Sequence, residues 1–276
     1  MKQILMLFFS VLVLFSTSVC MAGERMLPDF FPKVFDDIFI LDNDGSNKEG
    51  DTPLQFGEEK KVPLLSDTKE VKSIDLVIIL DKSGSMYDMT DDTIGGFNSC
   101  LDEQRKKDIP VKVSVGMFNQ VLDAKYDRVD LSEIKNITKE DYVPQGTTAL
   151  FDAVGNTLSA LKERPEVNAK GNKVLVVIMT DGMENASKEW SRDSVKKLIT
   201  ELHEKGYEFV FLGADIDAVG VAQGIGIKEE NSVKFKKTGA GVKGNFKAIN
   251  VMMEAVSVGN SLADDVKWRQ NIVEDK

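Results

Sequence analysis

The sequence predicts an α/β domain with a doubly wound, mostly parallel central sheet that is flanked by helices. Three observations carry this prediction. Apolar runs of strand length alternate with helical patterns along residues 73–256, as expected of strand-helix-strand units. The runs are almost continuously apolar, which is typical of strands covered on both faces. An early pair of runs joined by a tight turn predicts a hairpin, and therefore one antiparallel edge strand.

The elements follow one another in a regular order. A buried strand over 74–80 ends at Asp81, and strands over 111–118 and 121–129 form the hairpin. After these come a helix over 150–161, a strand over 174–179, a helix over 191–205, a strand over 207–212 and a helix over 248–256. A glycine-rich run over 239–244 resembles a dinucleotide-binding turn, but it comes too late in the chain for that role, so we expect a flexible loop there.

The chain on either side of residues 73–256 divides into three parts. Residues 1–22 carry one early cation, then an uncharged apolar run, then small polar residues, which together predict a signal peptide. Retention of this segment as a membrane anchor and lipidation at Cys20 are the alternatives. All three predict an exported protein, in the periplasm, in the cell envelope or secreted. Residues 23–72 read as a linker with a short amphipathic segment, and residues 257–276 as a tail with a short helix.

Composition restricts the class of partner. The 276 residues include 45 acidic and 35 basic side chains, for a net charge of -10, and duplex nucleic acid is therefore excluded as a partner. Removal of residues 1–22 would leave Cys100 as the only thiol, so the domain must be stabilised by its apolar core rather than by an intrachain disulfide.

Oxygen-bearing side chains gather where the predicted strands end. Asp81, Ser83 and Ser85 follow the first strand, Thr147 precedes a helix, and Asp181 follows a later buried strand. Because parallel strands present their carboxyl ends at one edge, these five side chains can converge. Oxygen ligands suit a hard cation, Mg²⁺ or Mn²⁺. The alternative is that the same residues cap the helices that follow.

These motifs resemble the von Willebrand factor A (vWA) domain and its metal-ion-dependent adhesion site. Asp-x-Ser-x-Ser at 81–85, Gly-Thr-Thr at 146–148 and Thr-Asp-Gly at 180–182 carry the resemblance, which extends over about residues 73–256. The sequence of residues 181–185 is similar to that of bacterial members of the family. The resemblance implies a Rossmann-like fold and a complete site. It also implies that the serines and Thr147 contact the cation, that the aspartates often act through water, and that a partner's carboxylate fills an open position.

From this resemblance we expect an exported, non-catalytic module that binds a protein ligand through a divalent cation, in adhesion or in assembly of an envelope complex. The ligand supplies an Asp or Glu carboxylate to the metal. No nucleophile with a matching base is recognisable, so we do not expect an enzyme. A membrane contact is expected only through an uncleaved signal anchor. The alternative function is a regulatory or assembly subunit of a multi-protein enzyme complex of the chelatase or stress-response type.

Overall fold

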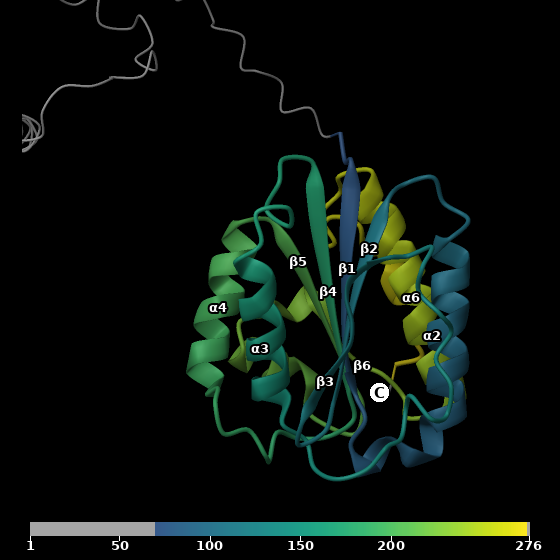
Figure 1. Ribbon diagram of the computed structural model, residues 1–276. Coiled ribbons are helices and arrows are strands. Elements are labelled where there is room, and N and C mark those ends of the chain that lie inside the picture. Colours follow the sequence, from purple (N-terminus) through teal and green to yellow (C-terminus); the bar gives the residue numbers. More distant parts are fainter. Residues whose placement is uncertain (1–69, 275–276) are drawn as a thin grey trace, which may run out of the picture. The chain divides into compact units, whose positions relative to one another are not determined.

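A six-stranded sheet forms the centre of the domain (Figure 1). The computed structural model describes residues 70–274, so the predicted signal peptide over 1–22, Cys20 and nearly all of the predicted linker over 23–72 lie outside the described residues. The strands are β1 (Ser73–Asp81), β2 (Val111–Phe118), β3 (Leu122–Asp130), β4 (Asn172–Thr180), β5 (Tyr207–Gly213) and β6 (Ser232–Lys234).

The order of strands across the sheet is β3-β2-β1-β4-β5-β6. Every neighbouring pair is parallel except the β2–β3 hairpin, which lies at one edge. The prediction of a mostly parallel, doubly wound sheet with one antiparallel edge strand is therefore confirmed. The central strands β1 and β4 are neighbours in register, so their carboxyl ends reach the same edge of the sheet.

Helices cover both faces of the sheet. Figure 1 shows α3 and α4 on one face and α2 and α6 on the other. The described helices are η1 (Gly84–Met89), α2 (Thr90–Gln104), α3 (Leu150–Lys162), α4 (Arg192–Glu204), α5 (Ala218–Gly224), η2 (Glu229–Asn231), α6 (Gly239–Ser257) and η3 (Val266–Asn271). None of those in the described part of the chain is long and apolar enough to cross a membrane.

Strand β1 shows why its sequence is apolar at almost every position. Leu76 and Ile78 pack into the core under α2 and α6, whereas Val77 and Ile79 pack into the core under α3 and α4. Successive side chains of a strand point to opposite faces, so a strand covered by helices on both sides buries all of them.

The glycine-rich run over 239–244 is helical, and the expectation of a flexible loop there is wrong. It forms the first turns of α6, and the Thr238 hydroxyl caps this helix by accepting a hydrogen bond from the Gly241 amide at 3.2 Å. A Cβ on Gly244 would lie 2.4 Å from the backbone oxygen of Asn271, so the glycine permits close packing of the following chain on α6. Here tertiary packing outweighs the low helix propensity of glycine.

The chain after α6 packs into the same core as α6 itself. Leu262 and Trp268 are fully buried, and Ile272 is nearly so. Phe235 forms an isolated antiparallel bridge with Glu274, which brings the end of the described chain beside β6. The segment that follows residue 256 therefore packs as part of this domain.

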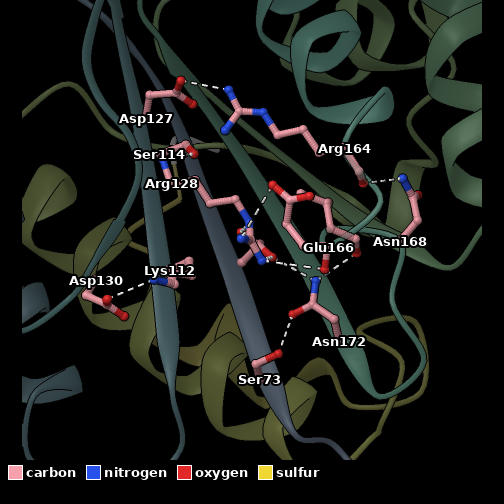
Figure 2. A network of polar contacts seen from close by, with 12 residues as sticks. Ser73, Lys112, Ser114, Asp127, Arg128, Asp130, Arg164, Glu166, Asn168 and Asn172 are labelled. Atoms are coloured by element: carbon pink, nitrogen blue, oxygen red, sulfur yellow. Dashed lines mark hydrogen bonds and ion pairs between the residues drawn. The ribbon is translucent and has the colours of Figure 1, made fainter.

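A buried ion pair lies toward the amino ends of β1 and β4. Asp75 is buried, and its carboxylate accepts hydrogen bonds from Arg128 Nε at 2.8 Å and from Asn172 Nδ2 at 2.7 Å. Figure 2 shows Arg128 between the hairpin and the loop that carries Glu166, with Asn172 reaching Ser73. Arg128 adopts a positive φ of 54° at an irregular point of the hairpin, a conformation that costs free energy in a non-glycine residue.

Candidate metal centre

Two buried aspartates mark the carboxyl ends of the central strands. Asp81 is the last residue of β1, and Asp181 directly follows β4. Because Leu80 pairs with Met179 in the parallel register, the two strands end side by side. Both carboxyl groups are buried, and the charge of Asp181 contributes to raising the pKa of Asp81. Two buried acids at one edge require hydrogen-bond donors or a cation nearby.

Serine hydroxyls connect these aspartates. The Ser83 amide donates to Asp81 Oδ1 at 2.6 Å, and the Ser83 and Ser85 hydroxyls are 3.0 Å apart. The Ser85 hydroxyl then donates to Asp181 Oδ1 at 2.6 Å. Four of the five residues singled out in the sequence are thus joined in one chain of hydrogen bonds that crosses from β1 to β4.

Neighbouring groups fix Asp81 in place. Its Oδ2 accepts a hydrogen bond from the Thr180 hydroxyl at 2.6 Å, and its backbone oxygen accepts one from the buried Tyr142 hydroxyl at 2.6 Å. Burial raises the pKa of the Asp81 carboxyl to about 6, because the charged form loses its hydration. Near neutral pH the carboxylate is therefore ionised at a cost that a cation would offset.

Thr147 and Thr148, which are neighbours in the sequence, differ in their burial and in their contacts. Thr147 is exposed, and its amide donates to Gln120 Oε1 at 3.2 Å; within residues 70–274 no hydrogen bond joins its hydroxyl to the serine-aspartate chain. Thr148 is buried. A Cβ built on Gly182 would lie 2.6 Å from Thr148 Oγ1 and 3.5 Å from Asp81 Oδ2, so the Thr148 hydroxyl faces the space beside Asp81. The Gly-Thr-Thr sequence alone does not distinguish the two.

The loop after β4 is held rigidly against this turn. Asn185 Oδ1 accepts from the Thr148 amide at 2.9 Å, while the Asn185 amide donates to the Thr148 backbone oxygen at 3.0 Å. The Glu184 carboxylate accepts from the Phe151 amide at 2.9 Å and from the Ser187 hydroxyl at 2.7 Å. The acidic and amide residues after Asp181 therefore position the site.

A lysine that the sequence did not single out as a site residue completes the centre. Lys237, between β6 and α6, places its ammonium 3.0 Å from Asp181 Oδ2 and 3.3 Å from Asp215 Oδ2. Burial lowers the pKa of Lys237, but the hydrogen bonds and charges of Asp181 and Asp215 outweigh burial and leave the pKa raised. No sequence spacing reveals this contact, because it depends on β6 lying beside β5.

The arrangement fits a hard divalent cation. All candidate ligands are carboxylate or hydroxyl oxygens, which Mg²⁺ and Mn²⁺ prefer. Asp181 Oδ2 is buried, and among residues 70–274 it pairs with the Lys237 ammonium at 3.0 Å, without an amide or hydroxyl donor. Gly182 leaves space beside Asp81 that any larger residue would fill. Residues 70–274 hold no cluster of three or more His, Cys, Asp or Glu side chains suited to a metal, so a cation here would depend on the hydroxyls.

The sequence matches one family over this region. A family model described as "VWA domain containing CoxE-like protein" matches residues 52–219, more than half of the chain. The chain belongs to this vWA family. The matched range includes both aspartates and both serines of the centre. No curated protein matches the chain.

The chain is also similar to several solved structures. The PilB minor pilin of Streptococcus sanguinis, as its D319A mutant, superposes with a TM-score of 0.51 at 12% identity, over 68% of this chain and 62% of that one. A mussel byssus matrix protein with zinc in its metal-ion-dependent adhesion site gives 0.46 at 17% identity, over 68% and 46%. Manganese-loaded TRAP protein of Plasmodium vivax gives 0.39 at 20% identity, over 51% and 57%. The chain thus spans less than two thirds of each of these structures.

Proposed function

We propose that this vWA domain binds a protein ligand through a divalent cation, Mg²⁺ or Mn²⁺, and that it is not an enzyme. Asp81, Ser83, Ser85 and Asp181 would hold the cation together with a threonine hydroxyl of the 147–148 turn. The hydrogen-bonded chain that runs from Asp81 to Asp181 carries this proposal. When bound, the cation supplies positive charge and an open position for an Asp or Glu carboxylate of the ligand.

Charge explains why a cation is needed. The protein has a net charge of -10, and its candidate centre contains buried carboxylates. An acidic ligand would be repelled from such a surface unless a cation stood between the carboxylate of the ligand and those of the centre. The neutral hydroxyls of the site contribute oxygens without adding negative charge, which favours retention of an open position.

Exposed apolar side chains around the centre support a protein ligand. Tyr87, Val121, Val143 and Met183 are 71%, 64%, 48% and 67% exposed. Tyr87 lies on η1, which also carries Ser85, and the other three lie on loops that carry or contact a site residue. We call these four residues the apolar rim. Beside it lies a hollow of about 380 Å³, which Val121 and Val143 also line. Val121 and Val143 thus lie together at this hollow, and exposed apolar side chains that lie together are typical of protein-binding surfaces.

The proposed function includes export of the protein. The lead segment over 1–22, with its cation followed by an uncharged run, supports export to the periplasm, to the cell envelope or into the medium. An exported binder of this kind would serve in adhesion or in assembly of an envelope complex.

A second function is favoured by the family match. CoxE-like vWA proteins are typically non-catalytic accessory subunits, and this supports a role as a regulatory or assembly subunit of a multi-protein enzyme complex. The two functions differ in where the protein acts. Fractionation that recovers the protein outside the cytoplasm, without its first residues, favours the first, and recovery of the intact chain in the cytoplasm favours the second.

An affinity capture tests the binding mechanism. Full-length protein is immobilised and exposed to cell extract in Mg²⁺, in EDTA, and as the Ser83→Ala variant in Mg²⁺. We expect a partner that the parent protein retains only in Mg²⁺ and that the variant does not retain. A partner retained equally under all three conditions would move the binding function to another surface.

A further inference from the structure

We propose that Lys237 is an internal counterion that holds Asp181 when no divalent cation is bound and that the cation must displace. This inference rests on the proposed function, because it assigns Lys237 to the regulation of the same centre. It also identifies a residue that sets the cation affinity of this chain from outside the serine and threonine motifs.

The geometry shows that Lys237 is shared between two carboxylates. Its ammonium lies 3.0 Å from Asp181 Oδ2 and 3.3 Å from Asp215 Oδ2. The Asp181 side chain is fully buried, and that of Lys237 is 27% exposed. Asp215 adopts a positive φ of 53°, which is uncommon for a residue other than glycine. A strained backbone at this position is explained if it lets Asp215 help to hold the ammonium.

The segment that carries Lys237 is anchored on both sides. The Phe235 amide donates to the Gly213 backbone oxygen at 2.8 Å, which continues the pairing of β6 with β5. The Lys236 amide donates to the Val273 backbone oxygen at 2.7 Å. After the lysine, Thr238 caps α6. Because the backbone is fixed, the long side chain of Lys237 is the part that can move.

Electrostatics makes the ammonium and a divalent cation competitors. Asp181 Oδ1 already accepts the Ser85 hydroxyl, and Oδ2 pairs with the Lys237 ammonium instead of with an amide or a hydroxyl. The ammonium meets that oxygen, and a second cation held by the same carboxylate would face a like charge in a partly buried setting, where Coulomb repulsion is strong. The partial exposure of Lys237 gives the displaced side chain access to water, with Asp215 as its remaining partner.

Calorimetric titration of Mg²⁺ into metal-free, full-length protein tests this inference. We expect Lys237→Met to bind Mg²⁺ at least about tenfold more tightly than the parent protein, because the competing charge is gone. Lys243→Met is the matched control. It removes the same charge from the start of α6, but the Lys243 ammonium pairs with Asp92 at 3.0 Å and is 60% exposed. Its Mg²⁺ affinity should stay within about twofold of the parent value, since exposed charges are screened.

Thermal unfolding gives a second readout that is independent of partner binding. In EDTA, Lys237→Met leaves Asp181 without a counterion, so its melting temperature should fall by at least about 3 °C below the parent value. In saturating Mg²⁺ that deficit should disappear or change sign. A variant whose deficit is the same in EDTA and in Mg²⁺ would show that Lys237 has a purely structural role, and the inference would be overturned.

A measurement on the parent protein avoids any folding defect of the variant. The side-chain ammonium of Lys237, assigned in nuclear magnetic resonance spectra by comparison with Lys237→Arg, should show slow hydrogen exchange in EDTA. It should lose that protection when Mg²⁺ is added. An ammonium signal unchanged by saturating Mg²⁺ would contradict displacement.

The outcomes separate this inference from the proposed function. If parent and Lys237→Met bind Mg²⁺ equally well and Ser83→Ala does not, the cation site is correct and the role of Lys237 is wrong. If none of these proteins binds Mg²⁺ or Mn²⁺, both proposals are wrong. Tighter binding by Lys237→Met alone supports both.

Discussion

Strand β1 carries a buried aspartate toward each end, and the two are stabilised in different ways. Asp75, near the amino end, accepts hydrogen bonds from the guanidinium of Arg128 and from the amide of Asn172. Asp81, at the carboxyl end, receives an amide and a hydroxyl, and no lysine or arginine of the described chain forms an ion pair with it. One strand thus carries a carboxylate with a permanent counterion and another without one.

The amino end of the sheet is therefore structural, whereas the carboxyl end is suited to exchange of its counterion. A bidentate arginine cannot be deprotonated and leaves little room for another cation. Hydroxyls can act as ligands of a divalent cation, and a flexible lysine can give way to it. The candidate function therefore belongs to the carboxyl edge of the sheet, where the counterions of the buried aspartates are weakest.

Removal of the permanent counterion should have the largest effect on stability. Arg128→Met leaves Asp75 buried and uncompensated, so we expect the free energy of unfolding to fall by about 3 kcal/mol or more. Urea denaturation measures this change. Arg164→Met, which breaks an exposed ion pair with Asp127, is the control and should cost less than about 1 kcal/mol. If both variants lose the same small amount, Asp75 is not held as we describe.

Removal of a hydroxyl at the carboxyl end of β1 should weaken cation binding strongly and change the stability little. Ser83→Ala should weaken Mg²⁺ binding by at least tenfold, or about 1.4 kcal/mol. Its free energy of unfolding in EDTA should change by only about 1 kcal/mol, because one hydroxyl contact is lost. Calorimetry and urea denaturation measure the two quantities. A large loss of stability with unchanged Mg²⁺ affinity would make Ser83 a structural residue.

The two threonines allow a finer test of the same edge. The buried hydroxyl of Thr148 faces Asp81, so Thr148→Val should weaken Mg²⁺ binding by about tenfold, which corresponds to one lost oxygen ligand. Thr147→Val should change it by less than about twofold on the same reasoning. The reverse order would assign the ligand to Thr147, as the family resemblance implies.

The apolar rim should affect partner binding and leave cation binding unchanged. Met183 is exposed and lies two residues after Asp181. Met183→Ala should weaken retention of a captured partner by about 1 kcal/mol while the Mg²⁺ affinity stays the same. Surface plasmon resonance with the partner, alongside calorimetry with Mg²⁺, measures both. A change in Mg²⁺ affinity alone would remove Met183 from the ligand surface.

The fold could be predicted because its signals are local. Continuous apolar runs and the Asn119-Gln120 turn were enough for the sheet and its antiparallel edge. The helical start of α6 cannot be predicted locally, because Gly241 is required by the close Lys236 backbone oxygen and Gly244 by packing against Asn271 of η3.

The centre could be predicted only in part. Asp81, Ser83, Ser85 and Asp181 stand at the ends of buried strands, and parallel pairing brings such positions together. The choice between Thr147 and Thr148 depends on which side chain turns inward. Lys237 depends on the pairing of β6 with β5, far along the chain, so its contact with Asp181 appears only in three dimensions.

Calorimetric titration of Mg²⁺ into the metal-free parent protein and into Ser83→Ala decides whether this edge of the sheet holds a cation. We expect saturable binding of one Mg²⁺ by the parent protein and binding at least tenfold weaker by the variant. Equal binding by the two proteins, or no binding of Mg²⁺ or Mn²⁺ by the parent, would contradict a cation centre at this edge of the sheet.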